Sequence, residues 1–222
     1  MMNLLVLSRY QNVLDSFFSS LLPTIDFNVR VFAITEGLKL PDDPRVIRVD
    51  RTEFAPNKYF NKVLRLIDGD YFGIVNDDII FSQGWLEDVL EKLETYDCVS
   101  PGFVESKDVS KLGTVVSKDG VVVGLFDAFY IFNKEVLDTL GEFDEGVIGW
   151  YDIDFMLSLY KAGFIPVTSR KVTVLHLGRV SYSLEERDKK NTKIAILKKY
   201  GRNGLLIAKN NPKSVRKEFL CL

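Results

Sequence analysis

The sequence has few of the residues that build disulfide frameworks or membrane spans. It contains two cysteines, Cys98 and Cys221, which are too few for a disulfide scaffold and fit a reducing compartment. No apolar stretch approaches the ~18 residues that cross a bilayer. The segment MMNLLVLSRY lacks the basic region and the small-residue cleavage site of a signal peptide. We therefore expect a soluble, cytoplasmic protein.

Internal repeats, low-complexity linkers and a clear domain boundary are also missing. The 222 residues are 46 % hydrophobic and 27 % charged, which excludes a disordered chain and supplies enough apolar material for a buried core. This length suits one domain of ordinary to large size. We expect a main domain over residues 1–184 and a basic helical extension, residues 185–222, that packs on the same domain.

Basic residues are concentrated in that extension. Residues 185–222 hold 11 Lys and Arg against 4 Asp and Glu, whereas the rest of the chain holds 18 against 27. An acidic body with a basic tail argues against a nucleic-acid-binding protein, whose basic residues would lie across the fold. Two interpretations of the tail stay open: a solvated helical face, or a contact with an anionic membrane surface or with a phosphorylated or lipid-linked substrate.

Short apolar runs alternate with helical patterns along the chain. The runs without polar alternation predict strands at residues 3–8, 28–34, 45–49, 71–75, 98–100 and 171–175. Apolar residues at helical spacing predict helices at residues 11–22, 57–68, 83–93, 134–140, 152–162, 185–200 and 212–219. A glycine turn at 118–120 predicts a hairpin between residues 113–117 and 121–132. These elements indicate an α/β fold with a mostly parallel sheet, helices on both faces, a small antiparallel insertion and a helical C-terminal appendage.

Asn76-Asp77-Asp78 is the first candidate for chemistry, because ligands of open parallel sheets bind at the carboxyl ends of strands. In an extended backbone, Asn76 and Asp78 share one face and Asp77 points to the other. A divalent cation with oxygen ligands would relieve the repulsion between the carboxylates, and Mg²⁺ or Mn²⁺ held in this way can neutralise a diphosphate. A polar turn that only ends the strand is the alternative.

Asp152 is the second candidate, at the start of a predicted helix. It shares a stripe of that helix with Met156 and Leu159, which indicates that it projects toward the core. Asp154 lies on the stripe of Lys161, which indicates a face toward water and a solvated or paired carboxylate. Asp152 fits a general base that takes a proton from a hydroxyl, and it also fits an N-cap.

Two further residues have both a functional and a structural interpretation. Trp150 precedes Asp152 and fits either a ring stacked on a sugar face or a buried core tryptophan. His176 is the only histidine of the chain and follows a predicted strand. A neutral imidazole there fits a metal site begun by a carboxylate, or a purely structural residue.

Taken together, these clusters resemble family 2 of the inverting glycosyltransferases, which use a GT-A fold. The family's strand, acidic triplet and following helix are matched by GDYFGIVNDDIIFSQGWLEDVL (69–90). The segment that contains its catalytic aspartate is matched by LGEFDEGVIGWYDIDFMLSLYKAGF (140–164), which is the most specific part. Its His-x-Gly-x-x-Ser stretch is matched by VLHLGRVSYS (174–183). The resemblance spans residues 3–201, from the first strand to a closing helix at 191–201.

The resemblance implies a Rossmann-like GT-A fold in which residues 1–184 form the catalytic domain. It also implies a role for each candidate residue. Asp78 would bind the metal, Mn²⁺ or Mg²⁺, that holds the diphosphate of the donor, with His176 as a further ligand and Asp152 as the catalytic base. The donor would contact Ser8, Tyr10, Glu36, Asn76 and Asp77, of which Asp77 lies near the ribose or the metal, and the acceptor would contact Trp150.

The implied activity is metal-dependent transfer of a sugar from a nucleotide diphosphate donor to a hydroxyl acceptor, with inversion. The acceptor would be a glycan, a lipid-linked sugar or a protein. Two positions depart from the family: Asn76 replaces the first residue of its Asp-x-Asp, and Tyr151 replaces the glutamate of its Glu-Asp pair. These departures favour a second interpretation, a catalytically silent nucleotide-sugar-binding module. A third, a sugar nucleotidyltransferase, requires a glycine-rich basic loop after the first strand, where LSRYQN has one arginine and no glycine.

Overall fold

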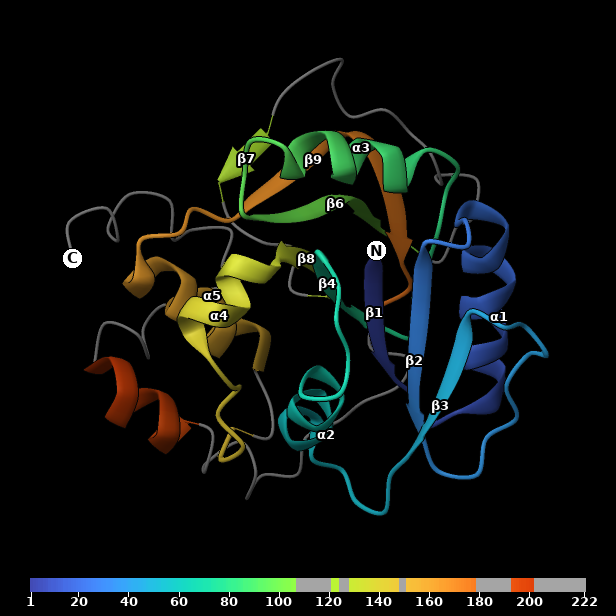
Figure 1. Ribbon diagram of the computed structural model, residues 1–222, viewed down its shortest axis with the longest axis horizontal. Helices are drawn as coiled ribbons and strands as arrows, with labels where there is room; N and C mark the ends of the chain where they lie inside the picture. Colours follow the sequence, from blue (N-terminus) through green and yellow to red (C-terminus); the bar gives the residue numbers. More distant parts are fainter. Residues whose placement is uncertain (107–120, 124–127, 148–150, 179–192, 202–222) are drawn as a thin grey trace.

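The computed structural model describes residues 1–106, 121–123, 128–147, 151–178 and 193–201 (Figure 1). Its strands are β1 (Met2–Leu7), β2 (Val29–Thr35), β3 (Val46–Asp50), β4 (Tyr71–Asn76), β5 (Ile79–Ile80), β6 (Cys98–Glu105), β7 (Val121–Val123), β8 (Phe129–Asn133) and β9 (Val167–His176). Its helices are α1 (Gln11–Leu21), a 3₁₀ turn (Leu22–Thr24), α2 (Pro56–Leu64), α3 (Trp85–Leu93), α4 (Lys134–Leu140), α5 (Tyr151–Ala162) and a helix at 193–201. None of the described helices is long and apolar enough to span a membrane.

The described strands form one sheet in the order β3-β2-β1-β4-β8-β6-β9-β5, with β7 paired to β9. Strands β1 to β4 run parallel, so that their carboxyl ends meet at one edge of the sheet. Strand β8 runs antiparallel to both β4 and β6, and β5 runs antiparallel to β9. The predicted α/β fold with a sheet flanked by helices is therefore confirmed, and the sheet is mixed, with four parallel and four antiparallel pairings among the described strands.

Helices cover both faces of the sheet and create two apolar cores. Helices α1 and α3 pack on one face, where the fully buried Trp85 lies against Phe129 of β8 with ring centroids 5.2 Å apart. Helices α2, α4 and α5 pack on the other face together with the helix 193–201, which inserts the fully buried Ile196 (Figure 1). Burial on both faces explains why the strands carry continuous apolar runs rather than alternating ones.

The second half of the chain differs from its predicted hairpin. The stretch 121–132 was expected to be one strand, but it contains two, β7 and β8, and β8 lies in the middle of the sheet. Its residues Phe129 to Phe132 are buried on both faces, which a central strand requires and a hairpin arm at the surface does not. Residues 113–120, 185–192 and 212–219, which include the other hairpin arm and most of the predicted tail helices, lie outside the described residues.

Candidate active site

The first part of the candidate site joins the carboxyl ends of β1 and β4. These strands are parallel neighbours with Leu7 opposite Asn76, so the residues that follow them lie side by side. The Ser8 hydroxyl donates a 2.6 Å hydrogen bond to Oδ2 of Asp77, and both side chains are at most 3 % exposed. The sheet register thus brings together two predicted donor-binding residues that are 69 positions apart in the chain.

The second part joins Asp78 to His176, the two predicted metal ligands. Strand β5 begins directly after Asp78 and pairs with β9, so that Ile79 lies opposite His176, and the Leu177 amide donates a hydrogen bond to the Asp78 carbonyl. This pairing leaves Nε2 of His176 3.4 Å from Oδ1 of Asp78. On the other side of His176, its Nδ1 lies 4.0 Å from Oε1 of Glu105, its partner on β6.

The chemistry of this pair fits a divalent cation. Asp78 is 3 % exposed, and its buried Oδ1 has no hydrogen-bond partner among the described residues. A buried carboxylate oxygen without a donor is costly unless a cation satisfies it. The described residues contain no group of three His, Cys, Asp or Glu side chains that could hold a metal. Two protein ligands suffice for Mg²⁺-like ions, which keep several waters and bind substrate phosphates.

Three residues that the sequence did not single out lie near the ends of β1 and β3. The guanidinium groups of Arg9 and Arg51 lie 5.2 and 6.0 Å from the centre of the Phe54 ring. Arg51 is 7 % exposed, its Nε has no hydrogen-bond partner in the described part of the chain, and burial lowers its pKa, against the opposing charge of Glu36. Both arginines lie just after a strand, but nothing in the sequence pattern indicates their shared aromatic neighbour.

The remaining donor-side candidates lie at the surface of the same edge. Tyr10 and Glu36 are exposed, directly after β1 and β2. Asn76 is half-buried, and its backbone amide donates to the Ala128 carbonyl next to β8. Exposed groups beside buried polar ones are typical of a site that is open to a ligand on one side.

Asp152 lies in the first turn of α5, and a chain of ring contacts ties that turn to β4. Phe155, one turn further along, stacks on Tyr130 of β8 with centroids 5.0 Å apart and an interplanar angle of 17°. Tyr130 pairs with Ile74, two residues before Asn76. Asp152 is half-buried, and Trp150 lies outside the described residues.

The prediction that the Asp154 face of α5 is turned to water is wrong. Asp154 is 2 % exposed, and of the two states left open for its carboxylate, the structure has the paired one. The helix 193–201 covers this face and places Lys199 and Tyr200 against Asp154. A helix that is buried on nearly all sides has no water-facing stripe, which periodicity alone does not reveal.

Two asparagines of α2 hold the loop that leads into α5. Asn61 accepts a hydrogen bond from the Phe143 amide at 2.8 Å and donates one to the Phe143 carbonyl at 2.9 Å. Asn57 donates to the carbonyls of Asp144 and Val147. Both asparagines are almost fully buried, so this clamp fixes the backbone just before the proposed acceptor side of the site.

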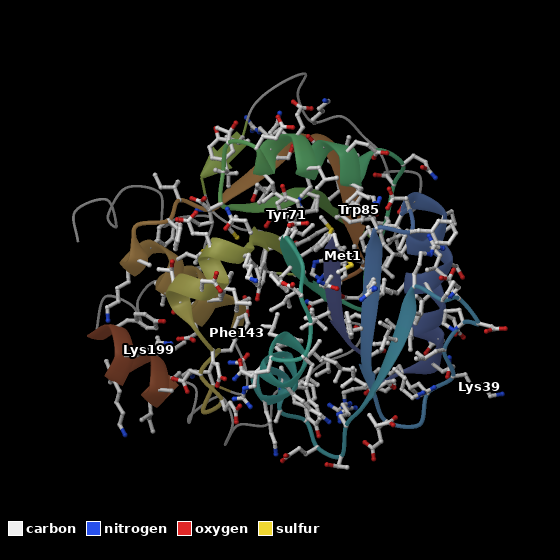
Figure 2. The ribbon with its side chains drawn as sticks, in the orientation of Figure 1. Met1, Lys39, Tyr71, Trp85, Phe143 and Lys199 are labelled. Atoms are coloured by element: carbon white, nitrogen blue, oxygen red, sulfur yellow. The ribbon has the colours of Figure 1, made fainter. Side chains whose placement is uncertain are left out.

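A cavity of about 300 Å³ lies beside α5, between α4 and the helix 193–201. Its walls include Phe143, Asp154, Lys161 and Lys199. Figure 2 shows the labelled Lys199 on the helix 193–201, on the same side of the molecule as Phe143. Asp78, Asp152 and His176 do not line this cavity.

Comparison with known families identifies the family of the chain. Residues 32–148, more than half of the chain, match the model of glycosyl transferase family 2. The chain belongs to this family. The match includes the Asn76-Asp77-Asp78 turn of this family 2 protein and ends before Asp152 and His176. No curated protein sequence matches the chain.

Solved structures similar to this family 2 chain are GT-A glycosyltransferases. The mannosyltransferase PcManGT from Pyrobaculum calidifontis, in complex with GDP-Man and Mn²⁺, has a TM-score of 0.57 and 15 % identity. GalNAc-T7 with UDP, GalNAc and Mn²⁺ has a TM-score of 0.69 and 9 % identity. The matches cover 81 % and 89 % of this chain but only 58 % and 47 % of those proteins, respectively. At this identity the likeness shows a shared fold, which is the predicted GT-A fold.

Proposed function

We propose that this chain transfers a sugar from a nucleotide diphosphate donor to a hydroxyl acceptor, with inversion at the anomeric carbon and with a divalent cation, Mn²⁺ or Mg²⁺. The observation that carries the proposal is the meeting of Asp78 with His176, where a buried carboxylate oxygen without a hydrogen-bond donor faces an imidazole nitrogen at 3.4 Å. Residues 1–184 are proposed as the catalytic domain, and residues 185–222 as an extension of it.

The donor is proposed to bind along the carboxyl ends of β1, β2 and β4. The buried hydrogen bond between Ser8 and Asp77 fixes the orientation of both side chains at this edge of the sheet. Asn76 is the last residue of β4. Tyr10 and Glu36 flank them at the surface. Arg9 and Arg51 add two positive charges close by, which suits a donor that carries a diphosphate.

Asp78 and His176 are the residues that would hold the cation. A divalent cation there supplies electrostatic stabilisation of the negative charge that develops on a leaving diphosphate. The neighbouring structures are complexes with Mn²⁺ and with GDP-Man or UDP, which supports both the cation and the donor class.

In the proposed reaction, Asp152 removes the proton from the acceptor hydroxyl. The acceptor oxygen forms a bond to the anomeric carbon while the bond from that carbon to the diphosphate oxygen breaks on the opposite side. The electron pair of the broken bond leaves with the diphosphate, and the proton stays on the Asp152 carboxylate. The ring contacts of Phe155 with Tyr130 support this role, since they tie the first turn of α5 to the strand that ends in Asn76. Trp150 is proposed to contact the acceptor.

A second candidate function is a catalytically silent nucleotide-sugar-binding module. One observation favours it: Asn76 and Tyr151 replace carboxylates of the family pattern. The two functions differ in one product, because a module that only binds the donor releases no nucleoside diphosphate.

The experiment measures release of nucleoside diphosphate from GDP-mannose and a panel of UDP-sugars with Mn²⁺, with water as the acceptor. We expect release by the unmodified chain and a loss of at least about a thousandfold in Asp152→Asn, because a general base and an oriented acceptor are lost together. Binding of GDP or UDP by Asp152→Asn should stay within about twofold, measured by calorimetry. Release that survives in Asp152→Asn contradicts the assigned base, and no release by the unmodified chain favours the binding module.

A further inference from the structure

Helix α5 is joined to the helix 193–201 by a polar network around the buried Asp154, in which the Lys199 side chain is 34 % exposed. Nζ of Lys199 lies 3.0 and 2.9 Å from the two carboxylate oxygens of Asp154. The Tyr200 hydroxyl lies 2.8 Å from Oδ1 of Asp154 and 2.6 Å from the hydroxyl of Ser158, one turn further along α5. The carboxylate of Asp154 is thus held by two consecutive residues of a helix that follows it by 45 positions in the chain.

The Tyr200 hydroxyl is a hydrogen-bond donor in this network at neutral pH. Burial and the charge of Asp154 raise the pKa of Tyr200 above its usual value, so that its hydroxyl keeps its proton and donates to Oδ1 of Asp154. The Ser158 hydroxyl lies 2.6 Å from the Tyr200 oxygen and also donates to the Asp154 backbone carbonyl at 3.0 Å. A charged Lys199 offsets the charge of Asp154, whose burial would otherwise be unfavourable.

Helix geometry links Asp154 to Asp152. Residues two apart differ by about 200° around the helix axis and by about 3 Å along it. The two carboxylates therefore project from nearly opposite sides of the first turn of α5. When the helix 193–201 holds Asp154, it fixes both the rotation and the axial position of the turn that presents Asp152.

The cavity beside α5 shows why this network matters for position. Asp154, Lys199 and Tyr200 all line this 300 Å³ space. On that side, therefore, close apolar packing does not set the position of α5 relative to the helix 193–201. Ile196 is buried in the core below, which keeps the helix 193–201 attached to the domain. Ile196 thus attaches the helix 193–201 to the domain, whereas the polar network orients this helix against α5.

We infer that Lys199 and Tyr200 are positioning residues for sugar transfer, which act through Asp154 on the orientation of Asp152. This inference rests on the proposed function, because it takes Asp152 as the group that accepts the proton. It gives a reason for keeping the Asp154 carboxylate buried, which is unfavourable unless a charged and hydrogen-bonding partner compensates for it. The inference also assigns a role in the catalytic domain to the basic extension, residues 185–222, which contains Lys199 and Tyr200.

The test compares Lys199→Met with Lys198→Met, which removes the charge of the adjacent, exposed lysine. The readouts are kcat for nucleotide release with Mn²⁺, the KM for the donor, and the Kd for GDP or UDP, at a temperature where circular dichroism shows every variant folded. Lys199→Met should lower kcat at least about tenfold and change KM and Kd less than about twofold, since a small misplacement of a reacting group is enough for such a loss. Lys199→Arg should restore kcat to within about threefold, and Lys198→Met should leave it unchanged.

Tyr200→Phe keeps the test decisive if Lys199→Met does not fold, because it removes one hydroxyl and no charge. Its kcat should fall about three- to tenfold with unchanged KM. An unchanged kcat in the folded variants overturns the inference, and so does a parallel loss of kcat and donor affinity, which indicates general loosening of the domain. Asp152→Asn separates the two proposals. If it abolishes release while the positioning variants do not reduce it, the proposed function stands and the positioning role fails.

Discussion

The donor side of the proposed site is carried by strands, whereas the acceptor side is carried by a helix that other helices hold in place. Ser8, Asp77, Asp78 and His176 all lie at strand ends, where the register of one sheet sets their neighbours. Asp152 lies on α5, whose position depends on the loop held by α2 and on the helix 193–201. A change of side chain on the donor side should therefore act locally, and one on the acceptor side should act through the packing of helices.

The largest difference between the two sides is expected in the binding of Mn²⁺ and nucleotide by Asp78→Asn and by Asp152→Asn. Removing the charge of Asp78 should weaken Mn²⁺ binding and Mn²⁺-dependent binding of GDP or UDP by at least about a hundredfold, because a hard cation needs its carboxylate ligand. Asp152→Asn should leave both affinities within about twofold. Calorimetric titrations with Mn²⁺, then with nucleotide, check this.

Asp50→Asn is the matched control for Asp78→Asn, since Asp50 also ends a strand but its side chain is 76 % exposed. It should change neither affinity. If Asp78→Asn binds Mn²⁺ and nucleotide as the unmodified chain does, the cation site lies elsewhere and the donor side of the account is wrong.

The next effect concerns stability and compares an ion pair whose carboxylate is buried with one whose two side chains are exposed. Asp154→Ala leaves Lys199 and Tyr200 without their partner, and we expect it to lower the free energy of unfolding by about 2–4 kcal/mol. Glu142→Ala breaks the exposed, bidentate pair with Arg65 and should lower the free energy of unfolding much less, because water screens an exposed pair. Urea unfolding followed by fluorescence gives both values, and equal losses contradict the network around Asp154.

A smaller effect is expected from the clamp on the loop before α5. Asn61→Ala leaves the Phe143 amide and carbonyl without their side-chain partner and should cost about 1–3 kcal/mol. Hydrogen exchange of the amides at 143–147 should accelerate, while exchange in β1 and β4 stays slow. Uniform acceleration in both regions indicates that Asn61 supports the whole domain and not the acceptor side in particular.

The smallest effect is expected from Arg51→Met. It removes a buried positive charge near Glu36 and Phe54 and should weaken binding of GDP or UDP about three- to tenfold, with little change in Mn²⁺ affinity. Arg48→Met is the control, since Arg48 is exposed and lies on β3, the strand that Arg51 follows. An unchanged nucleotide affinity in Arg51→Met shows that the arginine has a structural role only.

The difference between the donor side and the acceptor side also determines which parts of the site can be predicted from the sequence. The donor side follows from local pattern, because apolar runs define the strands and polar residues directly after them must gather at one edge of the sheet. Asp77 and Asp78 are found in this way, and His176 is found as the one histidine at a strand end. The hydrogen bond of Ser8 with Asp77 can be predicted only when the register of the strands is known, and the sequence alone does not give that register.

On the acceptor side, periodicity misleads because the partner of α5 is distant in the chain. Asp154 and Lys161 share a stripe, yet Asp154 is buried under a helix that begins more than 30 residues later. Strand β8 shows the same limit: its apolar run fits a hairpin arm, and only the full sheet shows that it lies between β4 and β6. Long-range packing decides both cases.

The central claim is that the strand-end pair and Asp152 serve one reaction. It is tested most directly by a crystal structure of the chain with Mn²⁺ and a nucleoside diphosphate. The account predicts the cation bound by Asp78 and His176, the diphosphate on the cation, and the Asp152 carboxylate facing the nucleotide. A cation held by other residues, or an Asp152 that faces away from the nucleotide, would contradict it.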